Sequence, residues 1–181
     1  IGLTLEGNSN GSAYFWIAAA FDWLEVRRLD RLGKYKHPRR LIKRTEDYWR
    51  LWIRKENPPL ELLEKKLAEF YRRSLIIIRT QIDAQGGILA ANDSDLVYFN
   101  RDTYSYVWPR DGALVAHAMD LAGHPTVSRN FFRFISSHIQ PEGCLLHKFN
   151  PDGTLASSWH PWSHDGQEQL PIQEDSTALL I

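Results

Sequence analysis

Apolar residues recur at the three- to four-residue spacing of amphipathic helices over most of the chain. This spacing predicts helices that begin near Phe21 and Pro38, that cover about residues 59–83, 110–122 and 126–139, and that begin again near Pro171. Gly123 and Pro125 fit a helix boundary, because glycine favours the position after one helix and proline the start of the next. We therefore expect a mainly α fold.

The predicted helix over residues 59–83 carries a clear apolar stripe. Its larger apolar side chains are Leu60, Leu63, Leu67, Phe70, Ile77 and Ile78. Its last part, Leu75-Ile76-Ile77-Ile78, is apolar in every direction. A helix that is apolar all round is normally surrounded by protein, so we expect this end to be buried on every side.

Two stretches depart from the helical pattern. Residues 1–19 are β-like, with a turn cluster at 8–12 and an aromatic and β-branched run at 14–17. Residues 141–171 are predicted to be long and irregular, and such stretches in a compact domain are often functional. The chain begins without Met and ends within an apolar helix, so we expect a fragment of a longer protein.

The amino-acid composition excludes several classes of protein. Hydrophobic residues make up 43% and charged residues 24% of the 181 positions, with no net charge, which excludes wholesale disorder. No apolar run reaches the roughly 18–20 residues that span a bilayer, so no membrane partner is expected. The single cysteine, Cys144, excludes an internal disulfide and is typical of a cytoplasmic protein, although a secreted parent protein stays open.

The zero net charge conceals an uneven distribution. Residues 25–56 carry twelve Lys and Arg against five Asp and Glu, whereas residues 104–181 carry four against eight. Trp49 and Trp52 interrupt the basic stretch, a combination that also suits nucleic-acid binding. Both Trp fall on the apolar stripe of their predicted helix. We therefore interpret the charges as a solvated face and expect no nucleic-acid partner.

The first chemical motif is Tyr104-Ser105-Tyr106-Val107-Trp108-Pro109-Arg110-Asp111-Gly112-Ala113, in which aromatics precede an Arg–Asp pair at a helix start. The helix dipole favours the Asp111 carboxylate there. A carboxylate accepts hydrogen bonds and a guanidinium donates them in a planar fork, so the pair can hold two neighbouring hydroxyls of a sugar. Alternatively, Asp111 caps the helix and Arg110 pairs with another acid.

Three further motifs follow in the irregular stretch and just after it. Lys148 precedes a Pro-Asp-Gly turn, where it either reaches a ligand hydroxyl or stays solvated. Trp159, in a polar loop, either stacks on a pyranose face or belongs to a satellite core. Gln173-Glu174-Asp175 either caps the last helix or lines a polar pocket.

His160 and His164 have the four-residue spacing of a metal-binding pair on a helix. Pro161 between them disfavours that helix, so no metal site is predicted.

The order of these motifs resembles the glucoamylase family, glycoside hydrolase family 15, and in particular its prokaryotic branch. The resemblance covers about residues 60–181 and rests on Tyr-Ser-Tyr-Val-Trp-Pro-Arg-Asp-Gly-Ala, His-Lys-Phe-Asn-Pro-Asp-Gly, Ser-Ser-Trp and Pro-Ile-Gln-Glu-Asp-Ser-Thr-Ala-Leu, in that order. It implies a partial (α/α)6 barrel over residues 58–181, the truncated first part of a catalytic domain. Residues 1–57 would be the end of a β-sandwich domain and a linker helix.

The resemblance also implies an activity. It is the inverting, exo-acting hydrolysis of α-glucosidic bonds in an α-glucan or α-glucoside substrate, without a cofactor. The residues assigned to the terminal-glucose subsite are Tyr104, Trp108, Arg110, Asp111, Lys148 and Trp159. The catalytic Glu pair of the family belongs to later segments, so no catalytic residue is predicted here and this fragment alone is expected to be inactive.

Three other functions are compatible with these residues, and the short chain has one structural consequence. A glucodextranase or a trehalase of the same family is the alternative activity, and a non-catalytic sugar-binding remnant is the alternative outside catalysis. An (α/α)6 barrel needs more residues than this chain has, so apolar faces left exposed would favour self-association.

Overall fold

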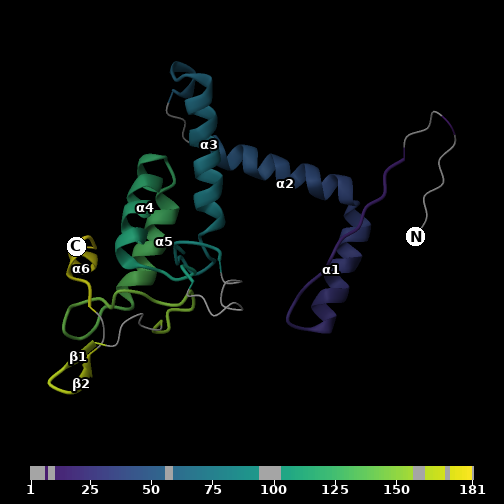
Figure 1. Ribbon diagram of the computed structural model, residues 1–181. Helices are drawn as coiled ribbons and strands as arrows, with labels where there is room; N and C mark the ends of the chain where they lie inside the picture. Colours follow the sequence, from purple (N-terminus) through teal and green to yellow (C-terminus); the bar gives the residue numbers. More distant parts are fainter. Residues whose placement is uncertain are drawn as a thin grey trace. The chain divides into compact units, whose positions relative to one another are not determined.

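Helices account for most of the described structure, which confirms the predicted mainly α fold (Figure 1). The computed structural model describes residues 7, 11–55, 59–93, 103–156, 162–169 and 172–180. The chain separates into two units, Ile1–Trp52 and Ile53–Ile181, which we call the N-terminal unit and the C-terminal unit. Among the described residues, no helix is both long enough and apolar enough to cross a membrane.

Two helices begin in the N-terminal unit, α1 (Trp23–Lys36) and α2 (Pro38–Ile53). Asp22 caps α1 by accepting a hydrogen bond from the backbone N–H of Glu25 at 2.8 Å. The helix ends at His37 because the following proline excludes helical backbone there, and Pro38 itself opens α2. Both helices begin close to their predicted positions.

The basic stretch of α1 and α2 is partly balanced by its own acids. Lys34 Nζ lies 2.8 Å from Asp30, and Lys43 Nζ lies 2.8 Å from Asp47, each one helical turn away. All four side chains are more than a third exposed. Such pairs contribute only about 0.3–0.5 kcal/mol each. They form the solvated face that the charge pattern indicates.

Residues 11–20 form neither helix nor strand, so the predicted β structure is wrong for this part of residues 1–19. Phe15 and Ile17 of the aromatic run are 78% and 96% exposed. A strand needs a neighbour that pairs with its backbone groups, and no described residue pairs with residues 11–20. Residues 1–6 and 8–10 lie outside the described residues.

The helix predicted over residues 59–83 is divided into two in the structure. Leu60–Leu62 is a 3₁₀-helix, η1, and α3 covers Lys65–Thr80. Leu63 and Glu64 between them are extended, with ψ angles of 151° and 139°. Helical hydrogen bonds cannot continue through such backbone, so α3 begins later than predicted.

The buried face of α3 also differs from the prediction. Ala68 and Leu75, two turns apart, are its buried residues. Leu67, Phe70 and Ile77 of the predicted stripe are 54%, 71% and 53% exposed. The expectation that residues 75–78 are buried on every side is therefore wrong. An apolar pattern shows what a helix can bury, but burial also requires a neighbouring element on each side. Self-association through this face stays a prediction.

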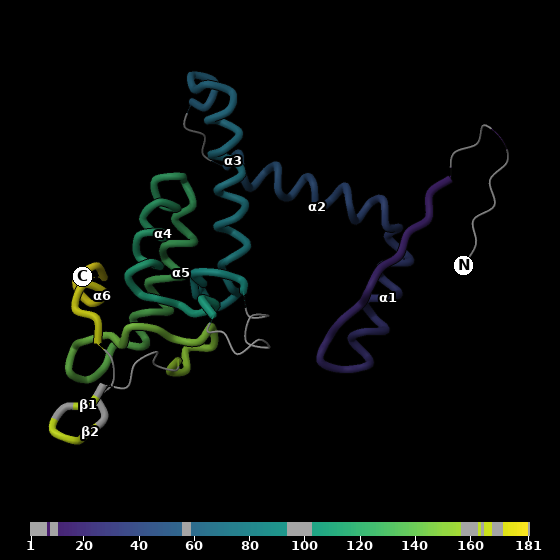
Figure 2. The backbone as a smooth tube through the Cα atoms, in the orientation of Figure 1, coloured from purple at the N-terminus to yellow at the C-terminus, as the bar shows by residue number. Residues whose placement is uncertain are grey.

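α4 (Pro109–Leu121) and α5 (Pro125–Ser136) pack side by side as a helical hairpin, which Figure 2 traces. Gly123, at φ 81°, and Pro125 form the predicted boundary between them. The core lies on this hairpin and on segments before and after it, and consists of Ile88, Val107, Ala113, Ala116, Phe131, Phe134, Ile135, Leu145, Leu146 and Phe149. Ile139, also predicted on the buried face of α5, lies beyond the helix and is 48% exposed.

Residues 141–171 are less irregular than the sequence predicts. β1 (Trp162–His164) and β2 (Gln167–Gln169) form an antiparallel hairpin. Its turn, Asp165-Gly166, has φ angles of 51° and 77°, and two positive values in succession are what a type I′ turn requires. The last helix, α6 (Glu174–Ala178), begins three residues after the predicted start at Pro171.

Gly112 lets α4 and α5 approach closely, because a Cβ at this position would meet the fully buried Phe131 ring. We expect Gly112→Ala to lower the free energy of unfolding by about 2 kcal/mol, because the close approach to the Phe131 ring places the overpacking cost near the upper end of its range. Overpacking costs about 1–3 kcal/mol, and alanine regains at most about 1 kcal/mol of helix propensity. Urea unfolding followed by far-UV circular dichroism measures this change.

The matched control is Gly33→Ala in α1, where the added Cβ would lie 3.5 Å from Trp16 Nε1, an ordinary contact. This variant is expected to lose no stability. An equal loss in both variants would contradict the packing role of Gly112.

Candidate functional site

The segment that leads into α4 brings three aromatic residues together. Val107 exchanges two backbone hydrogen bonds with Phe149, at 2.8 and 2.9 Å. Val107 belongs to the core, whereas the rings of Tyr104, Tyr106 and Trp108 lie beside one another. We call these three residues the aromatic cluster.

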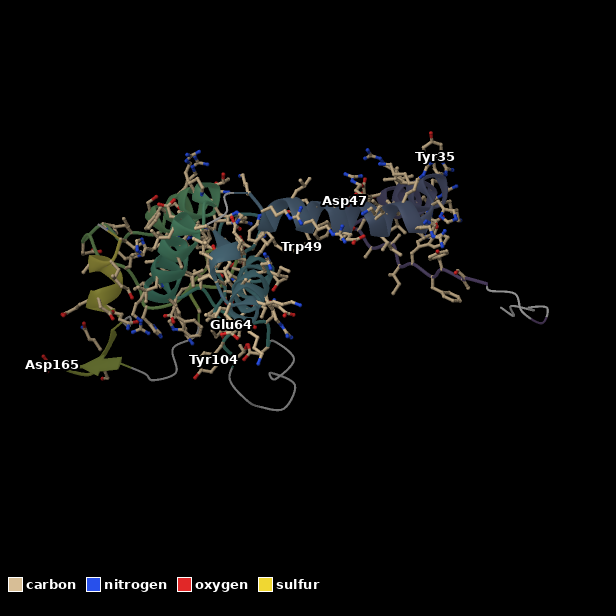
Figure 3. All side chains as sticks on the ribbon, turned by 90° about the horizontal axis from the view of Figure 1, so that it is seen from above. Tyr35, Asp47, Trp49, Glu64, Tyr104 and Asp165 are labelled. Atoms are coloured by element: carbon tan, nitrogen blue, oxygen red, sulfur yellow. The ribbon has the colours of Figure 1, made fainter. Side chains whose placement is uncertain are left out.

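The rings of the aromatic cluster contact one another. The Tyr104 and Trp108 ring centroids are 5.6 Å apart and tilted by 36°, and those of Tyr106 and Trp108 are 5.7 Å apart and nearly perpendicular. Trp108 is buried, whereas Tyr104 is 54% exposed and stands at the surface (Figure 3). The cluster thus has a buried base and an open aromatic edge, which suits contact with the apolar face of a ligand.

Lys148 packs against the aromatic cluster and belongs to the segment whose Phe149 pairs with Val107. Its Nζ lies 4.2 Å from the centroid of the Tyr106 ring and 5.8 Å from that of Trp108, and the residue is fully buried. A desolvated cation over an aromatic face contributes about 2 kcal/mol. Lys148 therefore ties the segment that contains Phe149 to the aromatic cluster.

A polar group lies at the first turn of α4. Arg110 donates to Asp111 Oδ2 and to Asp175 Oδ2, both at 3.4 Å, so it bridges α4 and α6. The three side chains are 39%, 49% and 51% exposed. Exposed pairs of this kind contribute about 0–1 kcal/mol each to stability. They therefore add little to the stability of the fold, and their donors and acceptors are partly open to solvent.

The sequence-predicted site residues fall into two groups. Tyr104, Trp108 and Lys148 meet in the aromatic cluster. Arg110 and Asp111 meet at the first turn of α4, which directly follows Trp108. Trp159 lies outside the described residues. The sugar-binding roles of all six residues stay predictions.

Two residues of the arrangement were not among the predicted site residues. Tyr106 could have been found from its place between Tyr104 and Trp108 in the same aromatic motif, although the tight turn between Tyr104 and Tyr106 leaves no signal in the sequence. Asp175 was left open between a cap and a polar pocket, and the structure places its carboxylate beside Arg110.

Metal ligands do not gather in the part of the chain that the structure describes, where no three His, Cys, Asp or Glu side chains could hold an ion together. The side chains of His160 and His164 lie outside that part.

Comparison with known proteins finds a partial relative. The chain is 31% identical over 88 residues to a protein of Methanocaldococcus jannaschii that is named as an uncharacterized glycosyl hydrolase. The matched stretch covers 49% of this chain but only 13% of that protein. No family model matches the chain, and no solved structure matches it significantly. About half of the chain is thus similar to a small part of a glycosyl hydrolase.

Burial lowers the pKa of His147 below its usual value, and the positive charge of Lys148 lowers it further. We expect Lys148→Met, which removes the charge and keeps the chain length, to raise the pKa of His147. Because burial remains, the pKa should stay below 6.5. Titration of the His147 ring protons by NMR measures this shift. Lys148→Arg, which keeps the charge, is the control, and an unchanged pKa in Lys148→Met would refute the contribution of the charge.

Proposed function

We propose that this chain holds part of the terminal-glucose subsite of an inverting, exo-acting α-glucosidase of the glucan 1,4-α-glucosidase type, built on an (α/α)6 barrel. One observation carries the proposal: Arg110, between two carboxylates, lies two residues after Trp108 of the aromatic cluster at the start of α4. The partial identity to a protein named as a glycosyl hydrolase supports the hydrolase class. The order of the four sequence motifs supports the glucosidase type.

The arrangement suits the two kinds of surface that a pyranose presents. Hydroxyl groups around the ring need both donors and acceptors, which the Arg110 guanidinium and the Asp111 carboxylate supply. The C–H groups on the ring face need a flat apolar partner, which the exposed ring of Tyr104 supplies. Asp111 is half-exposed and within reach of a ligand.

Neither Asp111 nor Asp175 is assigned a catalytic role. Inversion needs a protonated acid and a separate carboxylate about 6.5–9.5 Å apart. A guanidinium only donates hydrogen bonds, so both carboxyl groups face Arg110 as acceptors, whereas a general acid must present a proton. In the proposed function, Asp111 and Asp175 hold the substrate, and other residues serve as the catalytic acid and the catalytic base.

We expect the chain to bind maltose, and Asp111→Asn to weaken this binding about tenfold or more. A hydrogen bond to a charged group contributes about 1.5–3 kcal/mol, and about 1.4 kcal/mol corresponds to a tenfold change. Isothermal titration calorimetry measures the affinities. Asp120→Asn, at an exposed position later on α4, is the matched control and should bind like the unaltered chain.

The same titration separates the alternatives. Unchanged affinity in Asp111→Asn would count against every sugar-binding interpretation of this site. Binding of trehalose without maltose would favour the trehalase alternative, and a preference for isomaltose would favour the glucodextranase alternative.

For the protein that contains this chain, we expect maltose hydrolysis to release the non-reducing glucose as β-glucose, so that β-glucose is initially in excess, because an inverting enzyme delivers water to the face opposite the leaving group. Time-resolved proton NMR of the anomeric signals distinguishes β-glucose from α-glucose before they equilibrate. An initial excess of α-glucose over β-glucose would indicate retention and would exclude the proposed mechanism.

A further inference from the structure

Asp93 accepts hydrogen bonds from three consecutive residues at the start of the segment that carries the aromatic cluster. Its Oδ1 accepts hydrogen bonds from the Thr103 hydroxyl at 2.6 Å, the Tyr104 backbone N–H at 2.9 Å and the Ser105 hydroxyl at 2.9 Å. Its Oδ2 accepts a second contact from the Tyr104 N–H at 3.1 Å. One carboxylate therefore fixes both the backbone of Tyr104 and the residues on either side of it.

Two backbone N–H groups complete this hydrogen-bond network. The N–H of Asp93 donates to the Ser105 hydroxyl at 2.9 Å, and the N–H of Ser105 donates to the Thr103 hydroxyl at 3.0 Å. Thr103 is buried. Each hydroxyl thus both donates and accepts, so the carboxylate and the two hydroxyls define one geometry rather than several interchangeable ones.

The network also fixes one end of the segment that carries the aromatic cluster. At the other end, Val107 pairs with Leu89 and with Phe149. Residues 103–107 are therefore held at both ends, by the core at Val107 and by Asp93 at Tyr104. The Tyr104 ring, which is the exposed edge of the cluster, lies directly at the Asp93 end.

We propose that Asp93 is a positioning residue for sugar binding, which holds Tyr104 against Trp108 so that the exposed ring faces the ligand. The ligand in this statement rests on the proposed function, whereas the link between Asp93 and Tyr104 does not. Asp93 acts through Tyr104 and needs no contact with the sugar.

The ionised state of Asp93 supports this role. Hydrogen bonding lowers the pKa of the Asp93 carboxyl below its usual value, and the largest contribution comes from the Thr103 hydroxyl. The group is therefore a carboxylate at neutral pH. Hydrogen bonds to a carboxylate are shorter and stronger than those between neutral groups, so the Tyr104 backbone is held more firmly than in an ordinary turn.

Asp152 provides a matched control in the same unit. Its Oδ1 accepts from the Thr154 hydroxyl at 2.6 Å and from the Thr154 N–H at 3.0 Å, and hydrogen bonding lowers the pKa of its carboxyl as well. The two aspartates thus make the same kind of contact, but Asp152 orders a turn that contains no member of the aromatic cluster.

The first test is a double-mutant cycle on maltose affinity, measured by calorimetry. Asp93→Ala is expected to weaken binding about five- to tenfold, and Asp152→Ala to leave it unchanged. In a Tyr104→Ala background, Asp93→Ala should cause no further loss, because its effect passes through the missing ring. An equal loss in both backgrounds would overturn the proposal. Asp93→Asn, which keeps one acceptor oxygen, should show an intermediate loss and serves if Asp93→Ala does not fold.

The second test needs no sugar. In the chain labelled with 3-fluorotyrosine, the Tyr104 signal is identified by its absence in Tyr104→Phe. Fluorine NMR should show this signal shifted or broadened in Asp93→Ala and Asp93→Asn, and unchanged in Asp152→Ala. An unchanged Tyr104 signal in Asp93→Ala would overturn the proposal whatever the affinities. If the signal moves but the unaltered chain binds no sugar, the proposed function fails while the link between Asp93 and Tyr104 stands.

Discussion

The backbone pair between Val107 and Phe149 is the contact on which both the core and the candidate site depend. Val107 also pairs with Leu89, and Phe149 with Leu155, so the pair is the centre of a small antiparallel arrangement. Leaving such buried backbone groups unpaired would cost about 1–3 kcal/mol each. Because neighbouring side chains on an extended chain face opposite sides, burying Val107 and Phe149 brings Trp108 and Lys148 together. The core thereby places the site.

The two cations of the site have different uses, and this difference bears on the ligand. Lys148 is fully buried against aromatic rings, so its charge serves to hold the cluster. Arg110 is partly exposed and lies between two carboxylates, so the polar group at the start of α4 carries a net negative charge. A phosphate or carboxylate ligand would be repelled there, whereas a neutral polyol finds both donors and acceptors.

The sequence predicts a feature of this structure well when neighbouring residues decide it, and poorly when contacts between distant parts of the chain decide it. Gly123 and Pro125 located the boundary between α4 and α5 because helix ends are decided by a few adjacent residues. The buried face of α3 was predicted wrongly because burial depends on the elements beside a helix. The approach of Asp175 to Arg110, 65 residues away, is a tertiary contact that leaves no local signal at either residue.

The ten-residue motif around Arg110 also combines two functions that the sequence alone does not separate. Gly112 follows the Arg–Asp pair directly, and the Phe131 ring occupies the space that a Cβ at this position would fill. A larger residue would force the first turn of α4 away from α5 and move Arg110 relative to Asp175, because cores this close-packed transmit such displacements. The packing of α4 against α5 therefore explains the glycine at position 112 without any ligand. Arg110 and Asp111, in contrast, are partly exposed and contribute little to the fold. The residues proposed to contact a ligand and the glycine that brings them into place are neighbours in the chain, but Arg110 and Gly112 face opposite sides of the helix.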